Sequence, residues 1–498
     1  MTPQVHSING PVVTIHGGNF SAYEMVDING LRGEVIALAQ GTATVQVYDP
    51  TAGLRPGTPA TGTGKPMAVT LRPGLVGGIF DGTLQPLNDH AQQLWRVKVT
   101  AKVGQQLSQG LVFAEVEETP LITYKATVPP GVGGTVTRCA TNGEYTATCP
   151  IITLDGTYDF TLSQIWAIRT PRPMATRHPL TKPLITGQRV IDTFFPIAKG
   201  GTAAIPGGFG TGKTMTQHQL AKWCDADIII HIGCGERGNE MTEVLEDFAK
   251  LTDPKNGRPL LERTIIIANT SDMSVAAREA SIYTGITVAE GYRDMGYHVA
   301  IMADSTSRWA EALRELSGRL GEIPAEEGYP AYLASRLSAF YERAGYITTL
   351  GGAEGSITII GAVSPQGGDF SEPVTQQTKR FTHCYWALDR RLAYARHFPA
   401  IDWLTSYSNY NLDTWYATNI SPQFATARAK AMQILQEENA LMEIVKLIGQ
   451  DSLAENQLHN LQLAKIIRQK FLQQNAYDAA DTFMPPQAQF KLLQNLLG

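Results

Sequence analysis

One eight-residue segment constrains this chain more than any other feature of its sequence. It satisfies the pattern G-x-x-x-x-G-K-[ST], follows the short apolar run 203–205 directly, and precedes a segment of helical character. Its residues are Gly207, Gly208, Phe209, Gly210, Thr211, Gly212, Lys213 and Thr214. Between a strand and a helix, such a loop turns its backbone N–H groups toward phosphate oxygens. The segment predicts a phosphate-binding loop, and the alternative is a glycine-rich turn that matches the pattern by chance.

The end of this motif and a distant aspartate together predict a metal site. In such loops the lysine, here Lys213, reaches the β- and γ-phosphates, and the following hydroxyl, here Thr214, ligates Mg²⁺. Asp304 ends the apolar run 299–303, where a second carboxylate directed at Mg²⁺ is expected. An aspartate at a strand end is often only a helix N-cap, and Asp304 precedes Ser-Thr-Ser. Because the phosphate loop is present, we interpret Thr214 and Asp304 as ligands of Mg²⁺.

A glutamate that follows another strand is a candidate for orienting water. Glu236 and Arg237 lie in the segment 233–240, just past the apolar run 228–232. Loops at the carboxyl ends of parallel strands gather on one edge of a sheet, which would bring Glu236 to the phosphate loop. Glu236 would then orient the attacking water, and Arg237 would hold phosphate oxygens or fix the glutamate. The alternative is a solvated Glu–Arg pair in a loop.

The middle of the chain reads as an α/β domain. From about residue 171, continuous apolar runs alternate with amphipathic helical segments, as a parallel sheet covered on both faces requires. The runs that we expect to be strands are 226–232, 264–268, 299–303 and 357–360. We assign residues 171–410 to this nucleotide-binding domain.

The flanking regions have different patterns. Short β-branched runs at 12–15, 33–38 and 43–47, separated by turn residues, predict a small β-barrel over residues 1–70. A second β-rich stretch, assigned to residues 90–160, is interpreted as a structural insert. After residue 411 the spacing of Leu441, Val445 and Ile448 predicts a helix that ends at Gly449, so we assign 411–498 to a helical domain.

Charge and composition exclude several functions. The 498 residues include 41 Lys and Arg against 46 Asp and Glu, a net charge of −5, so the chain has no basic field to hold nucleic acid. The five cysteines show no zinc-type spacing, which favours reduced thiols in the cytosol. The first residues lack the pattern of a signal peptide, and no apolar run approaches the roughly 20 residues of a membrane helix. Work at a membrane would therefore need partners.

Several blocks together resemble the catalytic A subunit of prokaryotic V-type or A-type rotary ATPases. Besides the phosphate loop, the blocks that carry the resemblance are 233–241, 276–283, 303–308, 327–332 and 361–365. The similarity runs through nearly the whole chain, and the insert resembles the bulge that separates A subunits from F-type β subunits. The implied fold is multidomain α/β: an N-terminal β-barrel, a β-rich bulge, a RecA-like P-loop domain and a C-terminal helical bundle.

The resemblance also implies function and partners. The substrate would be ATP or ADP with Mg²⁺, and Phe398 matches the aromatic on which adenine stacks. Three A and three B subunits would alternate around a rotating central stalk, with a peripheral stalk and a membrane sector that moves protons or sodium ions. A neighbouring B subunit would supply an arginine to the transition state. The chain would then be cytoplasmic, held at the inner face of the cell membrane through the complex, with no nucleic acid bound and no membrane insertion of its own.

Departures from the family's usual residues in the phosphate loop and two alternative functions accompany this interpretation. Gly208 stands where the family commonly has proline, and Thr211 stands where eukaryotic subunits carry cysteine, which excludes a thiol switch in the loop and favours a prokaryotic enzyme. The first alternative is a non-catalytic, nucleotide-binding ring subunit, but such siblings lack the lysine or the glutamate that this chain has at 213 and 236. The second is a RecA-like motor acting on nucleic acid or on exported protein. The acidic balance and the family-specific blocks argue against it.

Overall fold

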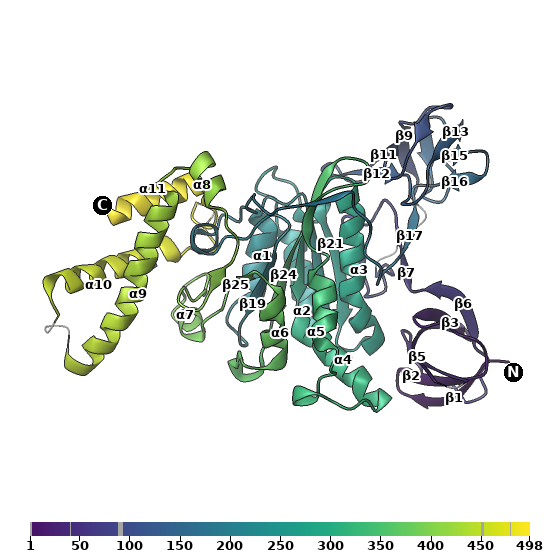
Figure 1. The fold of residues 1–498 in the computed structure, drawn as a ribbon, viewed down its shortest axis with the longest axis horizontal. Helices are drawn as coiled ribbons and strands as arrows, with labels where there is room; N and C mark the ends of the chain where they lie inside the picture. Colours follow the sequence, from purple (N-terminus) through teal and green to yellow (C-terminus); the bar gives the residue numbers. More distant parts are fainter. Residues whose placement is uncertain (1, 40, 88–92, 450–452, 479) are drawn as a thin grey trace.

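The computed structural model describes residues 2–39, 41–87, 93–449, 453–478 and 480–498. From the N-terminus the chain builds a barrel, a β-rich body, a large sheet with helices on both faces, and a group of helices near the C-terminus (Figure 1). This order of elements confirms the predicted multidomain α/β fold class.

The N-terminal barrel consists of a six-stranded antiparallel sheet in the order β1-β2-β5-β4-β3-β6. The strands are β1 (Gln4–Asn9), β2 (Val12–His16), β3 (Glu24–Ile28), β4 (Leu31–Ala39), β5 (Thr42–Val47) and β6 (Thr61–Pro66). Backbone hydrogen bonds between Val5 and residues 57 and 58, which lead into β6, bring the two edges together. Alternate residues such as Val13, Ile15 and Val45 fill the interior, which is the period-2 pattern of the sequence.

The β-rich body that follows has two four-stranded sheets, in the orders β10-β13-β15-β16 and β12-β11-β9-β14. Its strands are β9 (Trp95–Val99), β10 (Gln106–Leu107), β11 (Val112–Glu117), β12 (Thr123–Thr127), β13 (Gly134–Cys139), β14 (Gly143–Tyr145), β15 (Ile152–Leu154) and β16 (Tyr158–Phe160). Two further strands, β7 (Ala68–Leu71) and β17 (Gln164–Ala167), flank this body in the sequence. They pair with each other as antiparallel neighbours.

The central sheet has the order β26-β25-β19-β24-β22-β20-β21-β8 and is parallel from β25 to β8. Its strands are β8 (Ile79–Phe80), β19 (Thr202–Pro206), β20 (Ile228–Glu236), β21 (Thr264–Thr270), β22 (His298–Asp304), β24 (Glu354–Val363), β25 (Cys384–Tyr385) and β26 (Tyr407–Ser408). A side branch pairs β18 (Thr176–His178) with β23 (Gly345–Thr348), which joins β24.

Helices cover both faces of this sheet, which is why its strands read as unbroken apolar runs. Ile228, Ile230 and Ile232 pack with α3 (Val275–Asp294), α4 (Thr306–Leu320) and α5 (Leu333–Tyr341). The intervening Ile229 packs on the opposite face, in the cluster that contains α1 (Lys213–Trp223) and α2 (Gly238–Lys250). Two shorter helices, α6 (Pro373–Phe381) and α7 (Arg390–Tyr394), follow β24.

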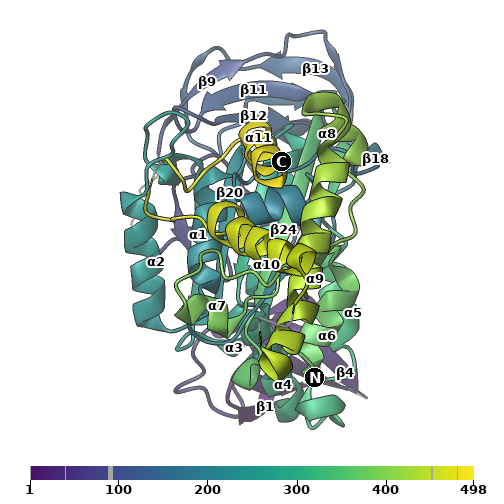
Figure 2. The same cartoon turned by 90° about the vertical axis from the view of Figure 1, so that its left-hand side faces the viewer.

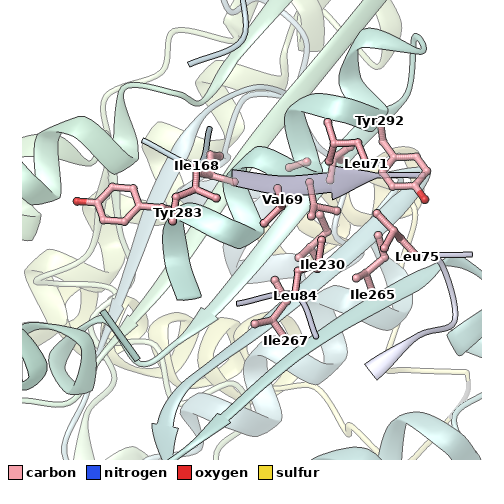
Figure 3. Close-up of a cluster of buried hydrophobic side chains, with 14 of the residues drawn as sticks. Val69, Leu71, Leu75, Leu84, Ile168, Ile230, Ile265, Ile267, Tyr283 and Tyr292 are labelled. Atoms are coloured by element: carbon pink, nitrogen blue, oxygen red, sulfur yellow. The ribbon is translucent and has the colours of Figure 1, made fainter. Parts of the chain in front are cut away.

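The segment between the barrel and the insert is part of the central core. β8 adds to the edge of the parallel sheet beside β21, although it lies far from that domain in sequence. Val69 and Leu71 of β7 pack in one buried cluster with Ile265 of β21 and Tyr292 of α3 (Figure 3). The core therefore joins segments that lie far apart along the chain.

The C-terminal part consists of α8 (Asp413–Asn419), α9 (Phe424–Ile448), α10 (Glu455–Ile467), a short π-helix Arg468–Leu472, and α11 (Pro486–Leu497). The predicted end of α9 at Gly449 is confirmed, and this glycine has a φ of 86° that favours a residue without Cβ. Buried residues of α9, α10, the π-helix and α11 belong to one cluster with residues of α1 and of the segment Val190–Phe194, on the side of the sheet that carries α1 (Figure 2). No helix in the described part of the chain has the length and apolar character needed to cross a membrane.

Candidate active site

Four neighbouring strands of the central sheet end at the same edge. β19 leads into the phosphate loop, Asp304 is the last residue of β22, and Glu236 is the last residue of β20. β24 lies between β19 and β22, and β20 lies beside β22. The structure thus brings together residues from three separate parts of the chain, as the parallel topology predicts.

The phosphate loop has the backbone conformation that its glycines allow. Gly210 and Gly212 have φ values of 75° and 87°, a left-handed region that other residues adopt only with strain. Gly212 is the N-cap of α1, so the positive end of the helix points into the loop. Inside the loop, the Lys213 Nζ donates hydrogen bonds to the carbonyls of Gly207 at 2.7 Å and Gly208 at 3.0 Å. Burial lowers the pKa of Lys213, while the charges of Asp304 and Glu236 oppose that shift.

The remaining loop residues have distinct surroundings. Thr211 is buried, and its hydroxyl donates to the Gly208 carbonyl at 2.8 Å, which closes the loop. A Cβ at Gly208 would meet nothing closer than Gly368 at 3.6 Å, so this position does not require glycine. Phe209 is 88% exposed and lines a separate cavity with Phe370.

Thr214 and Asp304 form a pair of oxygen donors next to the lysine. The Thr214 hydroxyl donates to Asp304 Oδ2 at 3.2 Å. Burial raises the pKa of Asp304, and the nearby ammonium of Lys213 opposes this. The N-cap of α4 is Ser305, so the alternative of Asp304 as the helix cap does not hold.

These two oxygens fit Mg²⁺, which prefers hard oxygen ligands and usually takes one or two from the protein and the rest from phosphates and water. The described ranges contain no group of three or more His, Cys, Asp or Glu side chains that could hold a metal ion. A cation held by two protein oxygens would take its remaining ligands from phosphates and water.

Glu236 has an unusual electrostatic environment. Burial raises its pKa to about 8, and the charge of Asp304 and a hydrogen bond with Glu240 act in the same direction. The charge of Arg308, in the first turn of α4, opposes the shift. A carboxyl group with a pKa near neutrality, at the edge where the phosphate loop lies, is the type of group that can polarise water.

Two arginines are associated with this glutamate. Arg237 is the next residue in the sequence, and the charge of Arg308 lowers the pKa of Glu236. Arg237 is the N-cap residue of α2, and within the described part of the chain it forms no ion pair with Glu236. Arg308 was not predicted from the sequence as a site residue, although it stands shortly after Asp304. Arg308 forms an ion pair with Glu311 at 3.0 Å. The sequence feature that could have indicated a site role is its position in the first helical turn after β22.

A cavity of about 740 Å³ lies beside the phosphate-loop helix. Phe398 lines it, as does Met215 of α1. Tyr477, which was not predicted from the sequence, lines the same cavity and is 86% exposed. It lies in the segment between the π-helix and α11, where no motif marks it. The cavity is large enough for a purine base, and it offers two aromatic rings for stacking.

Comparisons with known proteins agree along the whole chain. Residues 5–64 match the ATP synthase alpha/beta family β-barrel domain, and 85–169 match its barrel-sandwich domain. Residues 187–408 match the nucleotide-binding domain of the same family, and 413–497 match the C-terminal domain of V and A type ATP synthase.

Individual relatives are similar over nearly the full length. The chain is 57% identical to V-type ATP synthase alpha chain 2 of Clostridium tetani, covering 98% of this chain and 87% of that protein. It is 53% identical to the A subunit of the A-type ATP synthase of Methanopyrus kandleri, covering 99% and 88%. Among solved structures, the assembled ATPase EscN from the type III secretion system of enteropathogenic E. coli matches with a TM-score of 0.73 over 100% of both chains. Its sequence identity is 21%, so this likeness shows the fold alone.

Proposed function

Because this chain belongs to the family of A, or alpha, subunits of the V-type and A-type ATP synthases, we propose that it is the catalytic subunit of a rotary ATPase. In this role it couples ATP hydrolysis or synthesis to the transport of protons or sodium ions across a membrane. The observation that carries the proposal is the convergence of Lys213, Thr214, Asp304 and Glu236 at one edge of the central sheet.

Each of these residues has a task that its surroundings support. The loop N–H groups and the Lys213 ammonium hold the phosphates, and Thr214 and Asp304 hold Mg²⁺. When bound, Mg²⁺ neutralises charge on the phosphate oxygens. Glu236 accepts a hydrogen bond from water and orients it toward the γ-phosphate, while Arg237 contacts phosphate oxygens. Phe398 and Tyr477 stack on the adenine base.

The other two candidate functions have less support. A non-catalytic ring subunit would not need both Lys213 and Glu236 at the same edge. An export motor shares the fold at 21% identity, whereas the relatives named as ATP synthase subunits are 57% and 53% identical to this chain. The proposal therefore keeps the ATP synthase function.

Membership of this family makes the chain part of a multisubunit complex. We propose that it alternates with B subunits in a hexamer around a central stalk, with a peripheral stalk and a membrane sector completing the complex. It would lie in the cytoplasm, at the inner face of the membrane. The division at residues 1–70, 90–160, 171–410 and 411–498 remains part of this proposal.

The test is calorimetric titration of the full chain with Mg-ATP, comparing Lys213→Ala with Lys222→Ala. Both lysines lie on α1, but Lys222 is in its last turn, away from the loop. Lys213→Ala should lose ATP binding because the point charge on the β- and γ-phosphates is gone. Lys222→Ala should bind as the wild type does. Equal affinities in all three proteins would reject the phosphate-loop assignment.

A further inference from the structure

The cavity of about 740 Å³ beside the phosphate-loop helix is called the base cavity. Its wall on the Tyr477 side is a loop with little apolar packing of its own. Residues 473–478 and 480–481 follow the π-helix Arg468–Leu472, and six of them line the cavity: Gln473, Gln474, Asn475, Ala476, Tyr477 and Asp481. Only Gln474 among these is buried. Figure 2 shows this yellow segment passing beside α1 (Lys213–Trp223), where Gln219 donates to the Ala476 carbonyl at 3.4 Å. Because hydrophobic burial contributes little, polar contacts decide the conformation of this loop.

Arg189 is the centre of those polar contacts. Its guanidinium is 3% exposed, and all three nitrogens donate into the base of the loop. Nε donates to the Phe471 carbonyl at 2.6 Å, one terminal nitrogen to Asp481 Oδ1 at 2.6 Å, and the other to the Gln473 carbonyl. A planar guanidinium suits this arrangement because its donors keep a fixed relative geometry. A lysine would retain the charge but could not reproduce the fork.

Two further groups extend the contacts of Arg189 through the loop. The backbone N–H of Arg189 donates to Gln474 Oε1 at 2.6 Å. The backbone N–H of Gln474 in turn donates to the Phe398 carbonyl at 2.7 Å. Asp481 Oδ2 accepts the Asn475 amide at 2.7 Å, and Asn475 Oδ1 accepts the Tyr477 amide at 3.0 Å. A continuous chain of hydrogen bonds thus runs from Arg189 through Asp481 and Asn475 to the backbone of Tyr477.

We propose that Arg189 is a positioning residue for the base-binding wall: it holds the loop so that Tyr477 and Phe398 share one cavity, and it acts on ATP affinity only through that loop. The inference rests on the proposed function, because it assumes that this cavity receives the adenine of ATP. Arg189 lies shortly before β19, so it is fixed to the nucleotide-binding part, whereas the loop belongs to the C-terminal part. It therefore joins the two halves of the base site.

The experiment is a double-mutant cycle on ATP affinity, measured on the full chain with Arg189→Lys, Tyr477→Ala and the combined variant. Each single change should weaken Mg-ATP binding about tenfold, because one of two stacking surfaces is lost or misplaced. The combined variant should be no weaker than Tyr477→Ala, since misplacing a ring that is absent has no further effect. Losses that simply add would overturn the proposal, as would an unchanged affinity in either single variant.

A matched control and a substitute variant complete the design. Arg172 is equally buried, donates to Asp294 at 2.6 Å and does not line the cavity, so Arg172→Lys should leave ATP affinity unchanged. If Arg189→Lys does not fold, as judged by circular dichroism, Asp481→Asn replaces it in the same cycle with the same expected non-additivity. A wild-type chain that binds no Mg-ATP would remove the proposed function itself. A wild type that binds while the cycle is additive would remove only the role of Arg189.

Discussion

At the scale of single residues, Glu236 is a group whose environment departs far from water. It ends a buried strand, and burial together with neighbouring carboxylates raises its pKa to about 8. The structure thus disfavours negative charge on Glu236 at the edge where the phosphate loop opens. Residues that hold the phosphates and a residue that acts on water should respond differently to substitution.

We therefore expect Glu236→Gln to separate binding from chemistry. The amide keeps the size and hydrogen-bonding reach of the carboxyl group but has no ionised form that could polarise water. ATP affinity should survive, while the rate of the chemical step falls by roughly 10²- to 10⁴-fold. Single-turnover phosphate release from the chain assembled with its B partner measures this step. A rate within a few-fold of wild type would remove Glu236 from the mechanism.

At the scale of elements, one carboxylate joins three parts of the chain. Glu118, directly after β11, accepts hydrogen bonds from the amides of Gly74, Leu75 and Val76 at 2.7–3.0 Å. The Tyr292 hydroxyl of α3 donates to the same carboxylate at 2.8 Å. The insert, the segment between β7 and β8, and the central core therefore meet at this side chain. Burial raises the pKa of Glu118 to about 7 against the lowering effect of these donors.

This junction predicts a pH-dependent stability with a defined sign. Between pH 4.5 and 7 the unfolded chain has lost the Glu118 proton while the folded chain retains it, so stability falls as the pH rises through this window. The effect is at most about 3 kcal/mol and is complete above pH 7. The thermal midpoint of wild type should thus fall relative to Glu118→Gln from about pH 5 to 7. The exposed neighbour Glu117→Gln should show no such trend, and a flat difference for Glu118→Gln would contradict the prediction.

At the scale of the whole molecule, the described residues offer the proposed site no evident arginine for the transition state beyond Arg237 and Arg308, which is paired with Glu311. In the proposed hexamer that arginine comes from the B subunit. Such an arginine is worth about 10³- to 10⁵-fold in rate in related phosphoryl-transfer enzymes. The catalytic site would thus be complete only between two subunits.

The isolated chain should therefore bind Mg-ATP and hydrolyse it slowly. Steady-state phosphate release should rise by several orders of magnitude when the B partner is added. Sedimentation at the assay concentration verifies that the isolated chain is monomeric. Full turnover by a verified monomer would show that the arginine lies within this chain.

Much of this molecule was readable from local patterns. The loop at 207–214, the apolar strands and the end of α9 at Gly449 each depend on neighbours in sequence, through backbone freedom and periodicity. The roles of Lys213, Thr214, Asp304, Glu236, Arg237 and Phe398 were predicted from motifs and from the family resemblance, and they stay predictions. The convergence of Lys213, Thr214, Asp304 and Glu236 at one edge needed only the rule that parallel strands end on the same side of a sheet.

Tertiary structure alone decided the features that depend on distant segments. No pattern indicates that β8 joins the central sheet, that Arg308 acts on the charge of Glu236, or that Tyr477 shares a cavity with Phe398. In the sequence Arg189 has no feature that separates it from other charged residues. In the structure it is buried and donates to Asp481, which lies 292 positions later in the chain. The physical reason is that burial and hydrogen bonding depend on which segments contact each other in space, and the local sequence pattern does not indicate those long-range contacts.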